Sequence, residues 1–213
     1  QVKPEVLVHA AGRASVPLSM DYPDSDFQGG PPVVFSLLDA LRKRSPATRW
    51  VFLSSAAVYG NPVSLPLQES AEPRPLSPYG FHKHVGEILS REFAEIYSIA
   101  TTSVRIFSAY GPGLKKQVIW DICQKVTSNE EVMFQGTGDE SRDFIHGRDV
   151  ASAVFVVTQN APMKGEVYNV ASGVETSISH LVYSLHRCLA STARVRFAKT
   201  IPAGTPRHWV ANI

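Results

Sequence analysis

Short apolar runs that end in small or polar residues recur along the first half of the chain. Residues 6–11 form such a run and lead into Gly12, a pattern typical of a buried parallel strand whose carboxyl end opens into a ligand crevice. Residues 49–54 and 101–107 are also apolar and β-rich, which predicts two further buried strands. Three strands of this kind favour a parallel sheet.

Amphipathic stretches separate these strands. Residues 32–44 carry apolar side chains at helical spacing, and the glycines and prolines at 29–32 break or delay the start of that helix. Another helix is predicted from Pro78, with Ser77 as its N-cap. Strands and helices in this succession predict a doubly wound α/β sheet.

Beyond Gly113 the elements become shorter. The pattern predicts helices over residues 118–128, 149–158 and 176–189, and strands over residues 132–134, 167–170 and 195–197. For a chain of 213 residues, one core with a small appended lobe is as good an interpretation as two domains.

Composition narrows the class of protein. With 44% hydrophobic and 19% charged residues, the chain has the composition of a soluble globular protein. No apolar run approaches the roughly 18 residues that a bilayer requires, and no signal peptide precedes the first strand. We therefore expect a cytoplasmic protein with no membrane contact.

Charge and cysteine usage exclude two further classes of site. The net charge is +2, and no aromatic residues interleave with the basic pair Lys115 and Lys116, so no nucleic-acid partner is expected. Cys123 and Cys188 have no metal-ligand spacing around them. They are expected to be free thiols, and no metal site is predicted.

The candidate chemistry lies where the second strand meets the helix after it. Tyr79 and Lys83 are four residues apart and share a helix face, while Ser55 closes the strand. A phenol titrates at about 10, and an ammonium within about 4 to 6 Å would lower that pKa. The three side chains could move a proton at a carbinol while a hydride moves at the same carbon. Tyr-x-x-x-Lys alone is a weak signal, because a packed tyrosine beside a surface lysine has the same spacing.

The surrounding residues make the signal specific. Residues 54–60 and 77–87 together resemble the extended short-chain dehydrogenase/reductase family, in its NAD-dependent nucleotide-sugar epimerase/dehydratase branch of UDP-glucose 4-epimerase-like proteins. Four further segments resemble the same family in the same order, at residues 8–12, 105–113, 138–150 and 165–173.

This resemblance implies a fold. Residues 1–112 would form a truncated, Rossmann-like core that contains strands four to six of the family, and residues 113–213 would mainly form an α/β substrate-binding lobe. Residues at about 143–170 would return to the core. The expected fold class is thus α/β, a partial Rossmann-like doubly wound parallel sheet with a small C-terminal lobe.

The resemblance also implies roles for particular residues. Catalysis would fall to Ser55, Tyr79 and Lys83, with Tyr79 as the acid/base. NAD would be contacted by Ala10, Ala11, Gly12, Ser54, Tyr79, Lys83 and Phe107. A nucleotide-diphosphate sugar would be contacted by Ser55, Ala56, Ser108, Arg142 and Arg207, of which Arg142 suits phosphate oxygens because of its guanidinium fork.

One position discriminates among reactions of this branch. The 4,6-dehydratases of the family carry an acidic pair after the catalytic hydroxyl residue, whereas this chain has Ala56 and Ala57 there. A methyl group transfers no proton, so the sequence disfavours dehydration. It favours epimerisation at C4 of the sugar, or reduction of a keto-sugar with NADPH.

Other positions depart from the family pattern. The glycine-rich phosphate turn is not found in these 213 residues, and Gly30 stands where the family has an asparagine. Ser108 also stands where an asparagine is common. These departures predict a truncated chain that is stabilised as a homodimer through its exposed strand edge. The activity of its ancestor would still be recognisable from its sequence. A non-catalytic remnant that acts as a binding or assembly module is the alternative from a different class.

Overall fold

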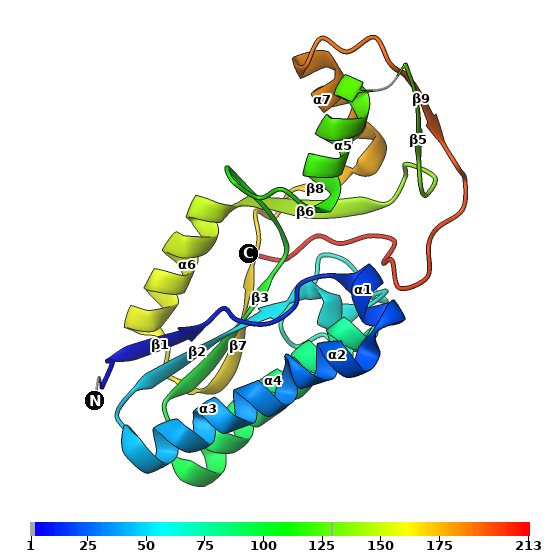
Figure 1. Cartoon of the computed structure of the whole chain (residues 1–213). Helices are drawn as coiled ribbons and strands as arrows, with labels where there is room; N and C mark the ends of the chain where they lie inside the picture. The colour runs from blue at the N-terminus through cyan, green and yellow to red at the C-terminus, as the bar shows by residue number, and fades with distance from the viewer. Residues whose placement is uncertain (1–2, 129) are drawn as a thin grey trace.

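Four parallel strands form the main sheet of this chain, whose computed structural model describes residues 3–128 and 130–213. The strands are β1 (Val6–His9), β2 (Arg49–Ser55), β3 (Thr101–Ile106) and β7 (Lys164–Val170), and they lie side by side in that order (Figure 1). Because all neighbours are parallel, the carboxyl ends of the strands meet at one edge of the sheet.

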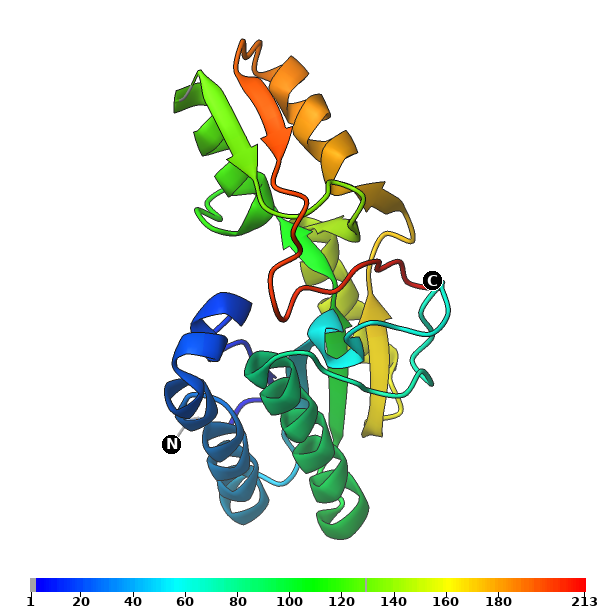
Figure 2. The same ribbon diagram turned by 90° about the vertical axis from the view of Figure 1, so that its right-hand side faces the viewer.

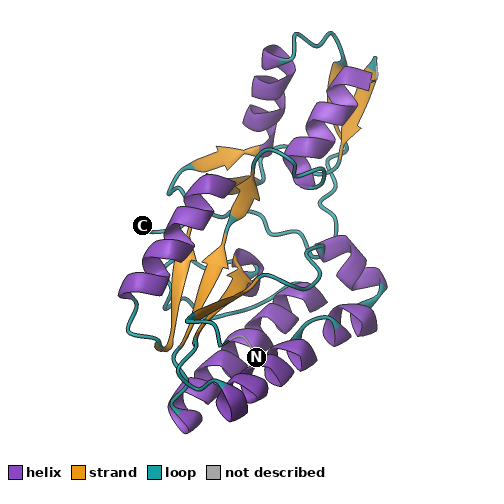
Figure 3. Cartoon of the chain, turned by 60° about the vertical axis from the view of Figure 1, so that its left-hand side comes forward, coloured by secondary structure: helices purple, strands orange, loops and turns teal. Residues whose placement is uncertain are grey.

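Helices cover both faces of this sheet, as the sequence predicts. Helices α3 (Pro31–Arg44) and α4 (Pro78–Tyr97) pack on one face and α6 (Gly147–Asn160) on the other (Figure 3). The alternation within β2 explains the two layers, since Trp50 and Phe52 join the cluster under α3 and α4, while Val51 joins the cluster under α6. The prediction of a doubly wound α/β sheet is confirmed.

Helix α4 lies close to β2 because two of its residues have no side chain. A Cβ on Gly86 would lie 2.4 Å from Cζ of Phe52, and a Cβ on Gly80 would lie 2.6 Å from the carbonyl oxygen of Ala57. The helix begins where predicted, since the Ser77 hydroxyl accepts a hydrogen bond from the Gly80 amide at 3.2 Å. The first turn of α4 is therefore fixed beside the end of β2.

Two short helices were not predicted. Residues 16–28 form α1 (Val16–Asp21) and α2 (Pro23–Gln28), with Ser15 capping α1. Each helix has only six residues, too few for a hydrophobic period to show in the sequence. They pack against α4 and form part of the wall around its first turn.

A smaller lobe follows β3. Its own apolar core lies between α5 (Gln117–Ser128), α7 (Ile178–Cys188) and the parallel pair β5 (Glu131–Phe134) and β9 (Arg194–Phe197). A three-stranded sheet of β4 (Ser108–Tyr110), β6 (Ser141–His146) and β8 (Glu175–Ser177) joins this lobe to the core. The predicted helix at 176–189 is shorter than expected because β8 takes its first residues.

The C-terminal segment runs from the lobe back to the core (Figure 2). The indole Nε1 of Trp209 donates to the Gly60 carbonyl at 2.8 Å, and Ala211 pairs with Leu67. Asp143 anchors the same segment, because its buried carboxylate accepts the amide of Ala211 at 3.2 Å. This return closes one side of the space between core and lobe.

Candidate functional site

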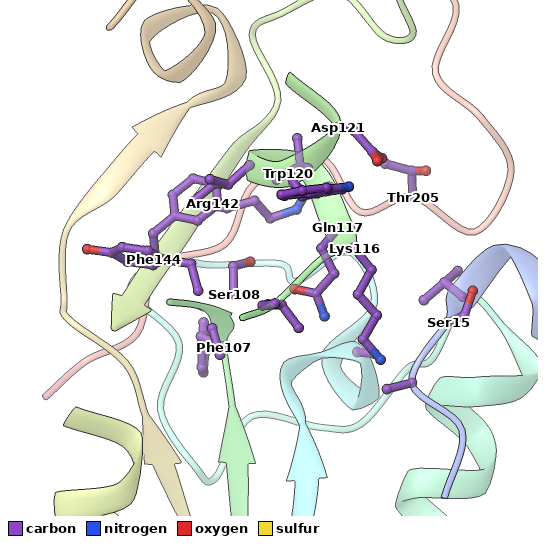
Figure 4. A pocket seen from close by; sticks show the side chains of 18 of the residues that line it. Ser15, Phe107, Ser108, Lys116, Gln117, Trp120, Asp121, Arg142, Phe144 and Thr205 are labelled. Carbon is purple, nitrogen blue, oxygen red and sulfur yellow. The ribbon is translucent and has the colours of Figure 1, made fainter. Parts of the chain in front are cut away.

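A cavity of about 660 Å³ lies between the carboxyl ends of the core strands and the lobe. Ser55 and Tyr79 line it from the core, and Arg142 lines it from β6. Figure 4 shows Arg142 beside Trp120, with Phe107 and Ser108 on the neighbouring wall. Cavities at the carboxyl ends of parallel strands are the usual ligand sites of open α/β sheets.

The hydroxyl groups of Ser55 and Tyr79 are brought together by β2 and α4. The Ser55 hydroxyl accepts from the Ala57 amide at 3.2 Å, and its side chain is hydrogen-bonded to Tyr79. The backbone amide of Tyr79 donates to the hydroxyl of Ser19 at 3.1 Å, which ties α1 to the start of α4. Sequence and structure agree on this pair of neighbours.

Lys83 lies one helical turn after Tyr79 and lines a different, smaller cavity that Tyr79 also borders. Its ammonium donates to the Leu53 carbonyl at 2.7 Å and lies 5.8 Å from the Tyr79 ring centroid. Burial lowers the pKa of Lys83 to about 8, against the opposing charges of Asp26 and Glu87.

In the chain without a bound cofactor, the pKa of Tyr79 lies above its ordinary value, so the neighbouring Lys83 alone does not lower it. Burial raises the pKa of the Tyr79 phenol, and the hydrogen bond with Ser55 opposes that rise only in part. The physical reason is desolvation, which disfavours the phenolate more than the nearby groups stabilise it. Without a bound ligand, Tyr79 therefore holds its proton at neutral pH.

A second and much smaller cavity, of about 20 Å³, lies beside Lys83. Ala11 and Gly12 line it from the end of β1, and Gly12 has a φ of +124° that favours glycine. Ala10 is exposed at the same strand end. Lys83 and this small-residue turn thus border the same small space. For the phosphate half of a dinucleotide the described residues offer no matching element, because the sequence holds no glycine-rich turn between a strand and a helix.

Arg142 is a half-buried cation whose nearest acidic influence is the charge of Glu140, which raises the pKa of Arg142 against the effect of burial. Its guanidinium donates to the carbonyls of Ser141 at 2.6 Å and Arg207 at 3.3 Å, and it lies 5.3 Å from the Trp209 ring centroid. Within residues 3–128 and 130–213, no carboxylate lies within ion-pair distance of it. Burial lowers the pKa of Arg142 to about 10, so the group stays charged at neutral pH.

Three further residues that were predicted to contact the cofactor or the substrate do not line the large cavity. The Ser54 hydroxyl donates to Glu87 at 2.6 Å inside the core, because Ser54 and Ser55 point to opposite faces of β2. Ala56 is fully buried, and Ala57 lines the large cavity in its place. The Arg207 side chain is exposed and outside the cavity lining, so only its backbone approaches the site.

Other lining residues were missed from the sequence. Lys116, just before α5, and Gln117, Trp120 and Asp121 in its first turns line the cavity (Figure 4). Their signal was the turn at residues 111–113, which directly precedes them and follows the predicted ligand-side strand. Asp26 and His82, which form a close pair beside Lys83, were also missed.

Several absences hold for the described part of the chain. It contains no cluster of three histidine, cysteine or acidic side chains suited to a metal ion. Cys123 and Cys188 are free thiols. None of its helices has the length and apolar character needed to span a membrane.

Comparisons with known proteins agree with this geometry. The model of the NAD dependent epimerase/dehydratase family matches residues 1–171. A UDP-glucose 4-epimerase of Mycolicibacterium smegmatis is 29% identical over 85% of this chain and 59% of its own length. A GDP-6-deoxy-D-mannose reductase of Pseudomonas aeruginosa is 30% identical over 84% of this chain and 61% of its own length. This chain therefore spans about three fifths of these relatives.

A solved structure extends the likeness to the fold. The UDP-N-acetylglucosamine 4-epimerase of Methanobrevibacter ruminantium M1, in complex with UDP-N-acetylmuramic acid, superposes with a TM-score of 0.89 at 28% identity. The match covers 98% of this chain and 68% of that protein, so both the sheet and the lobe are shared.

Proposed function

This chain belongs to the NAD dependent epimerase/dehydratase family, and on that premise we propose that it carries the substrate side of a nucleotide-sugar 4-epimerase. One observation supports this most directly. Ser55 and Tyr79 share a single cavity with Arg142, so hydroxyl groups for proton transfer and a cation for an anionic group line the same space.

In the proposed reaction, Arg142 binds the diphosphate of the nucleotide-sugar through its guanidinium. Trp120 and Phe107 contribute the apolar walls that surround the bound molecule. Ser55 hydrogen-bonds the 4-oxygen of the sugar, and Tyr79 accepts the proton from that oxygen and later returns it. The phenol gives up its own proton only where added positive charge offsets its burial, a role for Lys83 and for the cofactor ring.

NAD, when bound, would supply the hydride-transfer chemistry at C4 of the sugar, and the overall epimerisation would be redox-neutral. Lys83, Ala11 and Gly12 would hold its nicotinamide half. Dehydration remains disfavoured on this proposal, since the cavity wall at Ala57 offers only a methyl group where an acid would be needed.

The proposal is tested by titrating the chain separately with UDP-glucose and NAD in a calorimeter. Incubation with both, followed by chromatographic separation of UDP-glucose from UDP-galactose, then measures epimerisation. Saturable binding of both ligands and interconversion of the sugars are expected. A chain that binds neither ligand sinks the proposal, and one that binds UDP-glucose but not NAD acts as a binding module instead.

A keto-sugar reductase is the second candidate, favoured by the Pseudomonas aeruginosa relative at 30% identity. It uses the same proton-transfer residues but consumes NADPH. Net loss of NADPH absorbance with a nucleotide-linked keto-sugar, without interconversion of UDP-glucose, would select it.

A homodimer belongs to the same proposal. Val8 on the edge strand β1 is 40% exposed, which leaves an apolar position beside unpaired backbone groups. Sedimentation of the purified chain is expected to give twice the monomer mass, and a well-folded monomer would exclude pairing at this edge.

A further inference from the structure

A buried carboxylate beside the proposed proton-transfer pair has no role in the scheme above. Asp26, on α2, is only 4% exposed, and its Oδ2 lies 2.6 Å from Nδ1 of His82. His82 lies on α4 between Tyr79 and Lys83, and its ring meets Phe27 edge-on at 5.3 Å between centroids. The ring is thus held from two sides, and it fixes the carboxylate in turn.

This pair lines the small cavity together with Lys83 and Tyr79. The space of about 20 Å³ has room for about one water molecule. Gly30 borders the same cavity, and a Cβ there would lie 3.2 Å from the Asp26 carbonyl oxygen. The same Cβ would lie 3.7 Å from Cβ of His82, so Gly30 marks the place where the end of α2 meets α4.

The charges that face Lys83 differ in how far they are already neutralised. Glu87, from the next turn of α4, is paired with Arg105 at 2.8 Å. Asp26 has only His82, which is uncharged unless protonated. His9, from β1, is a neighbour whose own pKa is lowered by burial and by the Lys83 charge. On the β2 side, the Lys83 ammonium donates a hydrogen bond to the neutral carbonyl of Leu53. Asp26 is therefore the carboxylate whose charge is most available to the ammonium.

We propose that Asp26, oriented by His82, is a positioning residue that keeps the Lys83 ammonium charged and in place beside Tyr79. The inference rests on the proposed function for its catalytic meaning. Its physical content is independent of turnover, because the charge of Lys83 is a property of the chain itself. Burial lowers the pKa of Lys83 and the Asp26 charge opposes that change, as expected for this geometry.

The test is an NMR titration of the lysine side chains in the intact chain, labelled with ¹³C and ¹⁵N at lysine. The Lys83 signal is identified by its loss in Lys83→Met. In Asp26→Asn, which keeps the size of the side chain and an acceptor for His82, the Lys83 midpoint is expected to fall by about one pH unit. Asp24→Asn is the matched control, since it removes an exposed charge from the same helix and should leave the midpoint unchanged.

An unchanged Lys83 midpoint in folded Asp26→Asn would overturn the proposal. If that variant does not fold, Asp26→Ser makes the same comparison with a smaller side chain. Loss of folding in both variants would assign Asp26 to stability alone and would also overturn it. If the Lys83 midpoint shifts in Asp26→Asn but the unmodified chain shows no sugar interconversion, this inference is supported and the proposed function is contradicted.

Discussion

Two sides of the site differ in how their charges are balanced: the core wall, meaning Ser55 and Tyr79 with the charged groups packed behind them, and the lobe wall at Arg142. Behind Tyr79, the carboxylates have close side-chain partners, as in the pairs Glu87 with Arg105 and Asp26 with His82, and the Lys83 ammonium donates to the Leu53 carbonyl. On the lobe wall, Arg142 has only carbonyl oxygens and the Trp209 ring. The core side therefore pairs its carboxylates within the chain, whereas on the lobe side the Arg142 cation lines the cavity with Glu140 as an acidic neighbour beyond ion-pair distance.

This difference indicates which wall organises the chemistry and which attracts the ligand. Partnered buried groups hold their positions, because moving one would leave its partner unpaired at a cost of several kcal/mol. A desolvated guanidinium without a carboxylate gains most from an incoming anion. The four predictions below alter one wall at a time, in order of decreasing effect.

Removing the Tyr79 hydroxyl should produce the largest change. Tyr79→Phe keeps the ring in its packing position but deletes the proton-transfer group, so kcat/KM for sugar interconversion should fall by about 10² to 10⁴-fold. Affinity for UDP should stay within about twofold, because binding depends on the lobe wall. Steady-state kinetics and calorimetry measure the two quantities, and retained turnover in this variant would remove Tyr79 from its proposed role.

Breaking the buried ion pair between Glu87 and Arg105 should give the second largest effect, a loss of folding stability. Glu87→Gln leaves Arg105 charged and buried, which should lower the free energy of unfolding by about 3 to 5 kcal/mol in urea titrations. Glu95→Gln is the matched control on α4, since its ion pair with Arg91 is long, at 3.9 Å, and exposed. That control should change stability by at most about 1 kcal/mol. Equal losses in both variants would refute the claim that the core wall depends on this pair.

The core wall was also the part that the sequence could predict. Tyr79 and Lys83 share a helix face through their spacing alone, and the end of a parallel strand placed Ser55 beside them. The pairing of Asp26 with His82 could not be predicted, because it joins α2 to α4 across 56 residues and α2 is too short to give a periodic pattern. The direction of Ser54 was available from the strand alternation, which places adjacent residues on opposite faces.

The lobe wall was harder to predict because its residues come from distant segments. Arg142 was the expected diphosphate contact through its place in a family-like segment, and Arg207 was the weaker candidate. The structure sets Arg142 in the cavity wall, whereas the course of the C-terminal segment leaves the Arg207 side chain at the surface. Trp209, which packs against Arg142, belongs to that same returning segment. Local patterns carry no information about such contacts.

Neutralising the lobe wall should weaken ligand binding without harming the fold. Arg142→Gln should reduce the affinity for UDP by about 10 to 100-fold, the loss expected for hydrogen bonds to a charged group. Arg207→Gln makes the same change in charge at an exposed position and should leave the affinity unaltered. Calorimetric titration with UDP compares the two variants. The reverse order of effects would show that the cavity is not where the diphosphate binds.

The smallest expected effect concerns Lys83, the desolvated lysine behind Tyr79. Burial lowers the pKa of Lys83 from 10.5 to about 8, so between these values the unfolded chain binds more protons than the folded chain at this position. Stability from this group therefore rises with pH across that window, by about 1 kcal/mol between about pH 7 and 9. Urea unfolding at the two pH values should show the rise in the unmodified chain and lose that share of it in Lys83→Met. An identical pH dependence in both proteins would mean that Lys83 titrates as an exposed lysine does, and the core wall would then hold no desolvated cation to set against Arg142.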